Sequence, residues 1–142
     1  MSRSYNFIDH TADIAVQLKG DSIEELFSVG ADAWLYLVAG EVNLETDDST
    51  EIELSASSME ELLVTFLNEL NYNLNKNKWL CLSVQSIKVF NDEFGSELSA
   101  EISGIKLTND IKLKQEIKSV TYQQIEIVQM NGDYSTLVVF DI

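Results

Sequence analysis

The sequence predicts an α+β fold, in which two principal amphipathic helices pack on a mainly antiparallel or mixed β-sheet. Two observations lead to this prediction. First, two stretches combine a polar N-terminal cap with apolar residues at helical spacing. Second, most of the remaining chain alternates apolar and polar residues with the period of a half-buried strand.

Each predicted helix begins with a serine that is followed three residues later by a glutamate, which is the spacing of a capping box. The pairs are Ser22 with Glu25 and Ser58 with Glu61, and Gly40 is placed to end the first helix. The apolar stripes consist of Ile23, Leu26, Phe27, Trp34, Leu37 and Val38 in the first helix, and of Met59, Leu62, Leu63, Phe66, Leu67, Leu70 and Leu74 in the second. Because both helices are amphipathic, we expect both to lie on a sheet.

The predicted strands occupy most of the rest of the chain. They fall at residues 14–18, 52–54, 80–89, 98–102, 120–128 and 137–140. A change in the phase of the alternation near Gln85 and Ser86 predicts a β-bulge. The unbroken apolar run 137–140 is typical of a strand that is covered on both faces.

Length and composition predict a single domain that spans residues 1–142. The apolar fraction of 45% is that of an ordinary globular protein rather than a disordered one. No segment reaches the roughly 18 consecutive apolar residues that a membrane span needs, and the N-terminus has no basic region followed by an apolar run. We therefore expect no membrane association and a cytoplasmic location.

Charge and the scarcity of cysteine and histidine exclude several classes of protein. With 9 basic and 24 acidic residues the net charge is −15, which disfavours direct nucleic-acid binding because affinity for phosphates depends on clustered Lys and Arg. Cys81 and His10 are the sole cysteine and histidine, so neither an internal disulfide nor a Cys/His zinc site can form. Any bound metal is expected to be a hard ion with oxygen ligands, such as calcium, magnesium or manganese.

Two candidate functional segments lie at opposite ends of the chain. Residues 9–13 gather two carboxylates, an imidazole and a hydroxyl, and strand alternation directs Asp13 away from the face that carries Ile14. At the other end, Asp141 stands beside the terminal carboxylate of Ile142, and a cation would offset the repulsion between these anions. A polar turn before a strand and a pair of solvated anions are the alternative explanations.

Two further segments are weaker candidates. Asn68 and Tyr72 share one face of the second helix, with Glu69 between them, and they could instead be polar residues that hydrogen-bond to the sheet. Lys118 opens a hydroxyl-bearing segment that runs to Tyr122. This lysine could balance an acidic site or contact a phosphate, although surface strands carry such residues routinely.

Motifs of enzymes are absent from the sequence. There is no phosphate-binding glycine loop, dinucleotide fingerprint or serine nucleophile elbow, and nucleophile–base catalysis would depend on His10 alone. We therefore expect a protein that is not an enzyme. The alternatives are a small metal-dependent phosphoester hydrolase, in which the cation activates water and His10 transfers a proton, and a chaperone-like binder of apolar segments.

Several segments, taken in their order along the chain, resemble the archease family over nearly its whole length. They are Asp9-His10-Thr11-Ala12-Asp13-Ile14, the Ser-x-Glu-Glu start of the first helix, Phe66-Leu67-Asn68-Glu69-Leu70, Glu116-Ile117-Lys118-Ser119-Val120-Thr121-Tyr122 and Val139-Phe140-Asp141-Ile142. The opening and closing motifs are far more specific together than either is alone. The chain departs from the family at Gln123, where a histidine is common, and at Ile105, where a glutamate follows the glycine.

The resemblance implies a metal site built from both ends of the chain, which the first and last strands bring together. In it Asp13, Asp141 and Ile142 hold Ca²⁺, or another hard divalent cation such as Mn²⁺ or Mg²⁺. The residues expected to support these ligands or to contact a partner are Asp9, His10, Glu69 and Lys118.

The resemblance also implies a function. Archease assists the GTP-dependent RNA-splicing ligase, which joins RNA ends in tRNA splicing or RNA repair, by promoting its guanylylation and turnover. A chain with a net charge of −15 would dock on such a basic, RNA-binding enzyme without competing for its RNA.

Overall fold

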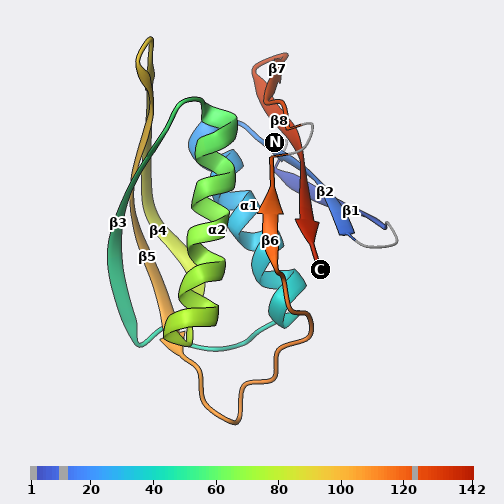
Figure 1. Cartoon of the computed structure of the whole chain (residues 1–142), viewed down its shortest axis with the longest axis vertical. Helices are drawn as coiled ribbons and strands as arrows, with labels where there is room; N and C mark the ends of the chain where they lie inside the picture. The colour runs from blue at the N-terminus through green and yellow to red at the C-terminus, as the bar shows by residue number, and fades with distance from the viewer. Residues whose placement is uncertain (1–2, 10–12, 123–124) are drawn as a thin grey trace.

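Two helices lie between two antiparallel sheets in the computed structural model of the chain, which describes residues 3–9, 13–122 and 125–142 (Figure 1). The elements are β1 (Ser4–Asp9), β2 (Asp13–Gly20), α1 (Ile23–Ala39), β3 (Asp48–Ala56), α2 (Met59–Asn77), β4 (Trp79–Asp92), β5 (Gly95–Lys106), β6 (Ser119–Thr121), β7 (Val128–Met130) and β8 (Asp133–Asp141). The predicted α+β class is confirmed, and the strands divide between two sheets where a single sheet was expected.

The larger sheet has the strand order β1-β2-β8-β6, with β7 also paired to β8, and the smaller sheet has the order β3-β5-β4. All pairings between the described strands are antiparallel. Figure 1 shows the smaller sheet on one side of α1 and α2 and the larger sheet on the other. Each helix therefore buries residues against two layers instead of one.

Both predicted helix starts are confirmed. The hydroxyl of Ser22 accepts a hydrogen bond from the Glu25 N–H at 3.0 Å, and that of Ser58 accepts one from the Glu61 N–H at 3.1 Å. Gly40 ends α1 with φ of 71°, a conformation that favours glycine. Local sequence chemistry thus sets the ends of α1 and the start of α2.

A second glutamate in each helix start fixes that helix to a sheet. The Glu24 carboxylate accepts a hydrogen bond from the Val89 N–H of β4 at 3.2 Å. The Glu60 carboxylate accepts one from the Ile127 N–H, just before β7, at 3.0 Å. Charge-assisted bonds of this kind are stronger than those between neutral groups. The N-terminus of α1 is thereby tied to the smaller sheet and that of α2 to the larger one.

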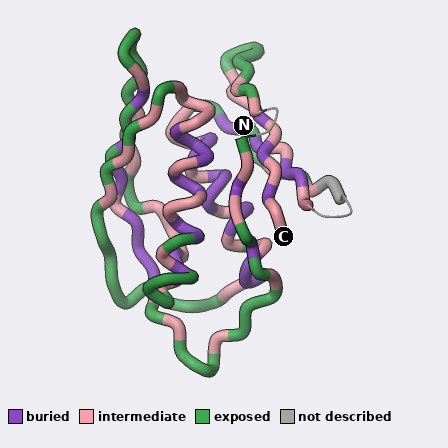
Figure 2. The backbone as a smooth tube through the Cα atoms, viewed as in Figure 1, coloured by how far each residue is buried: buried purple, intermediate pink, exposed green. Residues whose placement is uncertain are grey.

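The core fills the space between the helices and the two sheets (Figure 2). Trp34 is fully buried there, and its indole N–H donates to the Asn71 side-chain oxygen at 3.0 Å. The Asn71 amide in turn donates to the Ile117 carbonyl at 2.7 Å. This buried chain of hydrogen bonds links α1, α2 and the segment that leads into β6. No helix within the described ranges is long and apolar enough to cross a membrane.

Three features of the strands refine the sequence-based expectations. The strand expected to come first is preceded by β1, which pairs with it, so residues 9–13 join two paired strands. The register of β4 shifts between Val84 and Ser86, which confirms the predicted bulge. In β8 Val138 and Phe140, which face the helices, are fully buried, whereas Leu137 and Val139 are only partly buried, which corrects the expected cover on both faces.

Candidate metal centre

The register of the larger sheet places Asp13 directly opposite Asp141. These two residues are the partners at one end of the β2–β8 pairing, and Ser119 of β6 lies opposite Asp141 on its other side. Antiparallel partners share one face of a sheet, and their Cβ atoms lie about 4.5–5.5 Å apart. Asp13, Asp141 and Ser119 therefore form a row of oxygen-bearing side chains across three strands, which we call the acidic row.

Burial of the neighbouring residues fixes the face on which the acidic row lies. Phe140 is fully buried and Ile14, its partner in the register, packs against the same core. Because successive strand residues point to opposite faces, the acidic row lies on the face directed away from the helices. All three of its residues are half-buried, so a ligand can reach them from solvent.

The main chain at the end of β8 is held by the strand beside it. The Lys118 N–H donates a hydrogen bond to the Asp141 carbonyl at 2.8 Å. Ile142 is partly buried and packs against the core. These contacts restrict the last residues of β8, where chain ends usually fray.

Helix α2 positions the short strand β6 through one side chain. The Asn68 amide donates to the Val120 carbonyl at 3.0 Å, and its oxygen accepts from the Val120 N–H at 2.8 Å. A single side chain thus satisfies both main-chain groups of this residue, as a neighbouring strand would. Because Val120 lies next to Ser119, the helix sets the position of one end of the acidic row. The interpretation of Asn68 as a polar residue that hydrogen-bonds to the sheet is confirmed.

The other residues singled out in the sequence are placed less directly. Asp9 ends β1 opposite Ile14, and Lys118 adjoins the acidic row through its main chain while its side chain is exposed. Glu69 is half-buried in α2, and its side chain takes part in no hydrogen bond or ion pair within the described ranges. His10 falls outside the described residues, as does Gln123.

The donors of the acidic row are those of a hard-cation site. Carboxylate, hydroxyl and carbonyl oxygens suit Ca²⁺, Mg²⁺ or Mn²⁺, and two carboxylates on one face supply the negative charge that such ions require. The row alone is a sparse ligand set: the described residues contain no group of three or more His, Cys, Asp or Glu side chains placed to hold a metal ion. The hydroxyl of Ser119 was not expected as a ligand. The signal in the sequence is that Ser119 and Thr121 are two residues apart, next to Lys118, so both hydroxyls lie on one face of a strand.

An apolar hollow of about 250 Å³ opens at the same end of β2, on the side that faces α1. It is lined by Phe7, Ile14, Tyr36, Leu37, Lys114 and Gln115. The rings of Phe7 and Tyr36 stack at 5.7 Å, and the Lys114 ammonium lies 5.5 Å from the centroid of the Tyr36 ring. Accessible apolar surface is of the kind that protein partners bury, and this hollow lies on the face of β2 opposite to the acidic row.

Among the ionisable groups away from the acidic row, Asp32 and Cys81 have pKa values shifted by burial. Desolvation raises the pKa of the Asp32 carboxyl above its usual value, although the Arg3 guanidinium that pairs with it acts in the opposite direction. Burial raises the pKa of the Cys81 thiol to about 12, so this thiol stays protonated and unreactive near neutral pH. Neither group belongs to the candidate site.

Comparison with known sequences places the chain beside one family. Residues 5–142 match the sequence profile of the Archease protein family. The archease of Methanosarcina barkeri is 32% identical over 99% of this chain and 97% of its own length. The archease of Pyrococcus abyssi is 30% identical over 99% of each chain.

Two solved structures share the fold. The solution structure of protein 1598 of Methanobacterium thermoautotrophicum matches with a TM-score of 0.82 at 23% identity, over 97% of this chain and 98% of that one. The crystal structure of an archease, possible chaperone, from Thermotoga maritima matches with a TM-score of 0.65 at 24% identity, over 95% and 94% of the two chains. At these identities the likeness establishes the fold alone.

Proposed function

This chain belongs to the archease family, and we propose that it is a metal-binding, non-catalytic activator of an RNA-splicing ligase. The observation that carries the proposal is the pairing of Asp13 with Asp141, which joins carboxylates from opposite ends of the sequence on one face of a sheet. Like charges directly opposite each other on neighbouring strands are unfavourable. A cation held between them would offset that cost and would account for the two opposed carboxylates.

The chain's own residues would hold the ion in a defined place. Asp13 and Asp141 would bind through carboxylate oxygens and Ile142 through a main-chain oxygen, with the Ser119 hydroxyl as a further donor. Calcium prefers about 6–8 oxygen ligands, so water or oxygens of a partner would complete the shell. When bound, the ion supplies concentrated positive charge that a phosphate or carboxylate of the partner can coordinate.

Charge supports a protein as the partner. A net charge of −15 opposes contact with an RNA backbone and favours a basic enzyme that itself binds RNA. The apolar hollow beside Ile14 adds surface that a protein can bury at the same end of β2, on the face opposite to the acidic row. We therefore infer that the chain docks by this end of the larger sheet and presents its metal to the ligase as the ligase accepts GMP.

A guanylylation assay with the cognate ligase tests the proposal. The wild-type chain should accelerate transfer of GMP to the ligase in the presence of Mn²⁺ or Ca²⁺. Asp13→Ala should reduce the stimulation by about tenfold or more, because even the loss of a group that supports a metal ligand typically costs about 10–100-fold in affinity or activity. Asp110→Ala, which removes an exposed carboxylate from a loop, is the matched control and should stimulate like the wild type. Equal stimulation by Asp13→Ala and the wild type would exclude the metal mechanism.

The same purified proteins separate the two alternative functions. Turnover of a phosphoester with Mn²⁺ by the chain alone, abolished in His10→Ala, would favour a metal-dependent hydrolase. Suppression of the aggregation of unrelated proteins, unchanged in Asp13→Ala, would favour a general chaperone. The proposal expects neither result.

A further inference from the structure

One face of the smaller sheet is left uncovered by the helices, and we call it the outer face. The register of β3, β5 and β4 arranges its side chains in three rows: Glu51, Glu101 and Ser86; Glu53, Ser99 and Lys88; and Ser55, Glu97 and Phe90. All of these residues except Glu101 are exposed, whereas the intervening residues of β5 are buried against the helices. Figure 2 shows the exposed residues along the same three strands.

Two phenylalanines stand at one end of the outer face with most of their surface in water. Phe90 is 63% exposed in β4, and Phe94 is 89% exposed in the turn between β4 and β5. A phenylalanine side chain gains about 1.5–3 kcal/mol when it moves from water to an apolar environment. Large aromatic side chains in such positions are typical anchors of protein interfaces.

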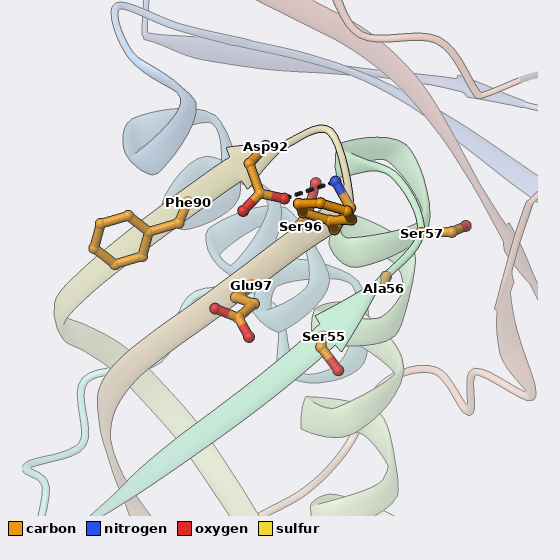
Figure 3. Close-up of a pocket in the computed structure, with 9 residues that line it drawn as sticks. Ser55, Ala56, Ser57, Phe90, Asp92, Ser96 and Glu97 are labelled. Carbon is orange, nitrogen blue, oxygen red and sulfur yellow. Dashed lines mark hydrogen bonds between the residues drawn. The ribbon is translucent and has the colours of Figure 1, made fainter.

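Hollows on both sides of Phe90 give a partner a place to bind. One hollow of about 370 Å³ and another of about 380 Å³ are both lined by Ser55, Phe90 and Glu97. In Figure 3 the Phe90 ring projects beyond the edge of the sheet, and the Glu97 and Ser55 side chains project from the strands beside it. The aromatic ring, the carboxylate and the hydroxyl therefore form one continuous surface.

The turn that carries Phe94 is held in place by its own hydrogen bonds. The Asp92 carboxylate accepts from the Phe94 N–H at 2.8 Å, which Figure 3 marks with a dashed line. Gly95 follows with φ of 142°, and a side chain added there would meet the Ala56 carbonyl oxygen at 2.7 Å. The tight turn thus presents Phe94 in a fixed position, which lowers the entropy cost of binding.

The charges of the outer face identify the occupant. Its three rows hold four glutamates and one lysine, and Asp92 and Glu93 extend the acidic surface to the turn. RNA and anionic membranes would be repelled. A second copy of this chain would place like charges against each other. We infer that the outer face is a docking surface for a basic segment of a protein, in which lysines or arginines pair with the glutamates and an apolar side chain packs on Phe90 and Phe94.

This docking surface is separate from the acidic row. The two sheets lie on opposite sides of the helix layer, so the outer face and the acidic row belong to different sides of the molecule (Figure 1). A basic protein could occupy the outer face while the ligase occupies the end of the larger sheet. The inference therefore goes beyond the proposed function and stands without it.

A labelled peptide of about 12 residues is a direct probe, with Ser at every second position and, between the serines, Lys in one half and Leu in the other. At about 3.3 Å per residue it spans the outer face, and its Lys and Leu side chains share the side that faces the sheet. The full chain should bind it, with amide shifts in NMR spectra concentrated in 51–55, 86–90 and 97–101. The double variant Phe90→Ser with Phe94→Ser should weaken binding about tenfold, or about 1.4 kcal/mol, without any change in net charge. Tyr72→Ser, which alters an aromatic residue on α2 that is 55% exposed, is the matched control and should bind normally.

A second pair of variants tests the charges in the same way. Glu53→Gln with Glu97→Gln should also weaken binding about tenfold, whereas Asp110→Asn with Glu116→Gln, which removes as much charge from a loop, should change it less than about twofold. A peptide of alternating Lys and Ser should bind more weakly and be insensitive to the phenylalanine variant. NMR spectra of each variant verify the fold.

Equal losses in the outer-face and loop variants, or unchanged binding in both outer-face variants, would overturn the inference. So would amide shifts spread over the whole acidic surface. A wild-type dimer that dissociates in the phenylalanine variant would show that the outer face binds a second copy of this chain. That result would likewise overturn the inference of a basic partner.

Discussion

Asp13 and Asp141 are the residues on which the proposed function depends, and stability measurements can isolate their role. A ligand that binds the folded state alone stabilises it by about 2.7 kcal/mol when its free concentration is about 100 times Kd. We therefore expect Ca²⁺ or Mn²⁺ to raise the thermal unfolding midpoint of the wild type and to leave Asp13→Asn unchanged. Asp110→Asn should keep the increase. Equal increases in all three proteins would indicate that the ion binds elsewhere.

Cys81 allows an independent test of the core. Burial raises the pKa of its thiol from 9.0 to about 12, so the folded state keeps its proton where the unfolded chain loses it. The resulting contribution to stability is present below pH 9.0 and is lost as the pH rises toward about 12. Alkylation by iodoacetamide at about pH 8 should be far slower in the folded protein than in urea. Rapid alkylation of the native protein would contradict the placement of β4.

The sequence alone could single out the two aspartates but could not pair them. Alternation fixes only that Asp13 faces away from Ile14 and that Asp141 faces away from Phe140. A shift of the strand pairing by two residues would preserve both faces and separate the carboxylates. The register therefore depends on long-range packing, which the structure supplies. The place of Ser119 opposite Asp141 could not be predicted for the same reason.

At the scale of the elements, β6 is the part of the site that has least support of its own. It is three residues long, pairs with β8, and makes two hydrogen bonds with the Asn68 side chain at Val120, accepting one and donating the other. Asn68→Ala should lower the free energy of unfolding by about 1–3 kcal/mol, because both main-chain groups of Val120 lose their partner. It should also accelerate amide exchange at Val120.

The matched control for this prediction lies on the same helix. Asn75 is exposed, so Asn75→Ala should change stability by less than about 0.5 kcal/mol. Urea unfolding of the two variants provides the comparison. A loss no greater in Asn68→Ala than in Asn75→Ala would show that β6 is held by its strand pairing alone.

The helices were predictable because their signals are local. Serine caps and large apolar residues mark α1 and α2 correctly. The second sheet was not predictable, because the additional buried face of α1 consists largely of small residues, including Gly30, Ala31 and Ala33. Small residues leave little trace in a hydrophobic pattern. The strand β1 was missed for a similar reason, since only Tyr5 and Phe7 alternate within it.

At the scale of the whole molecule, the net charge of −15 should make stability depend on salt. The screening length falls from about 30 Å at 0.01 M to about 3 Å at 1 M ionic strength. Because screening weakens the repulsion among acidic residues, we expect the thermal unfolding midpoint to rise with added KCl. A midpoint that falls with KCl would show that attractive charge pairs dominate instead.

The acidic row and the outer face are two separate groups of carboxylates, and each is proposed to bind a different kind of ligand. The acidic row draws its oxygens together at the end of β2 and β8. The outer face spreads its glutamates along β3 and β5, where they match a basic segment better than a single ion. The account therefore predicts that an added metal ion binds the acidic row more tightly than the outer face.

The central claim is that Asp13 and Asp141 together hold a metal ion, and locating the bound ion tests it most directly. Substoichiometric Mn²⁺ added to the isotopically labelled protein broadens the NMR signals of the amides nearest the ion. The account predicts that the signals of 13–14, 119–120 and 140–142 are lost first and that they persist in Asp13→Asn. Broadening that begins at 51–53 and 97–101, or that is the same in Asp13→Asn, would contradict it.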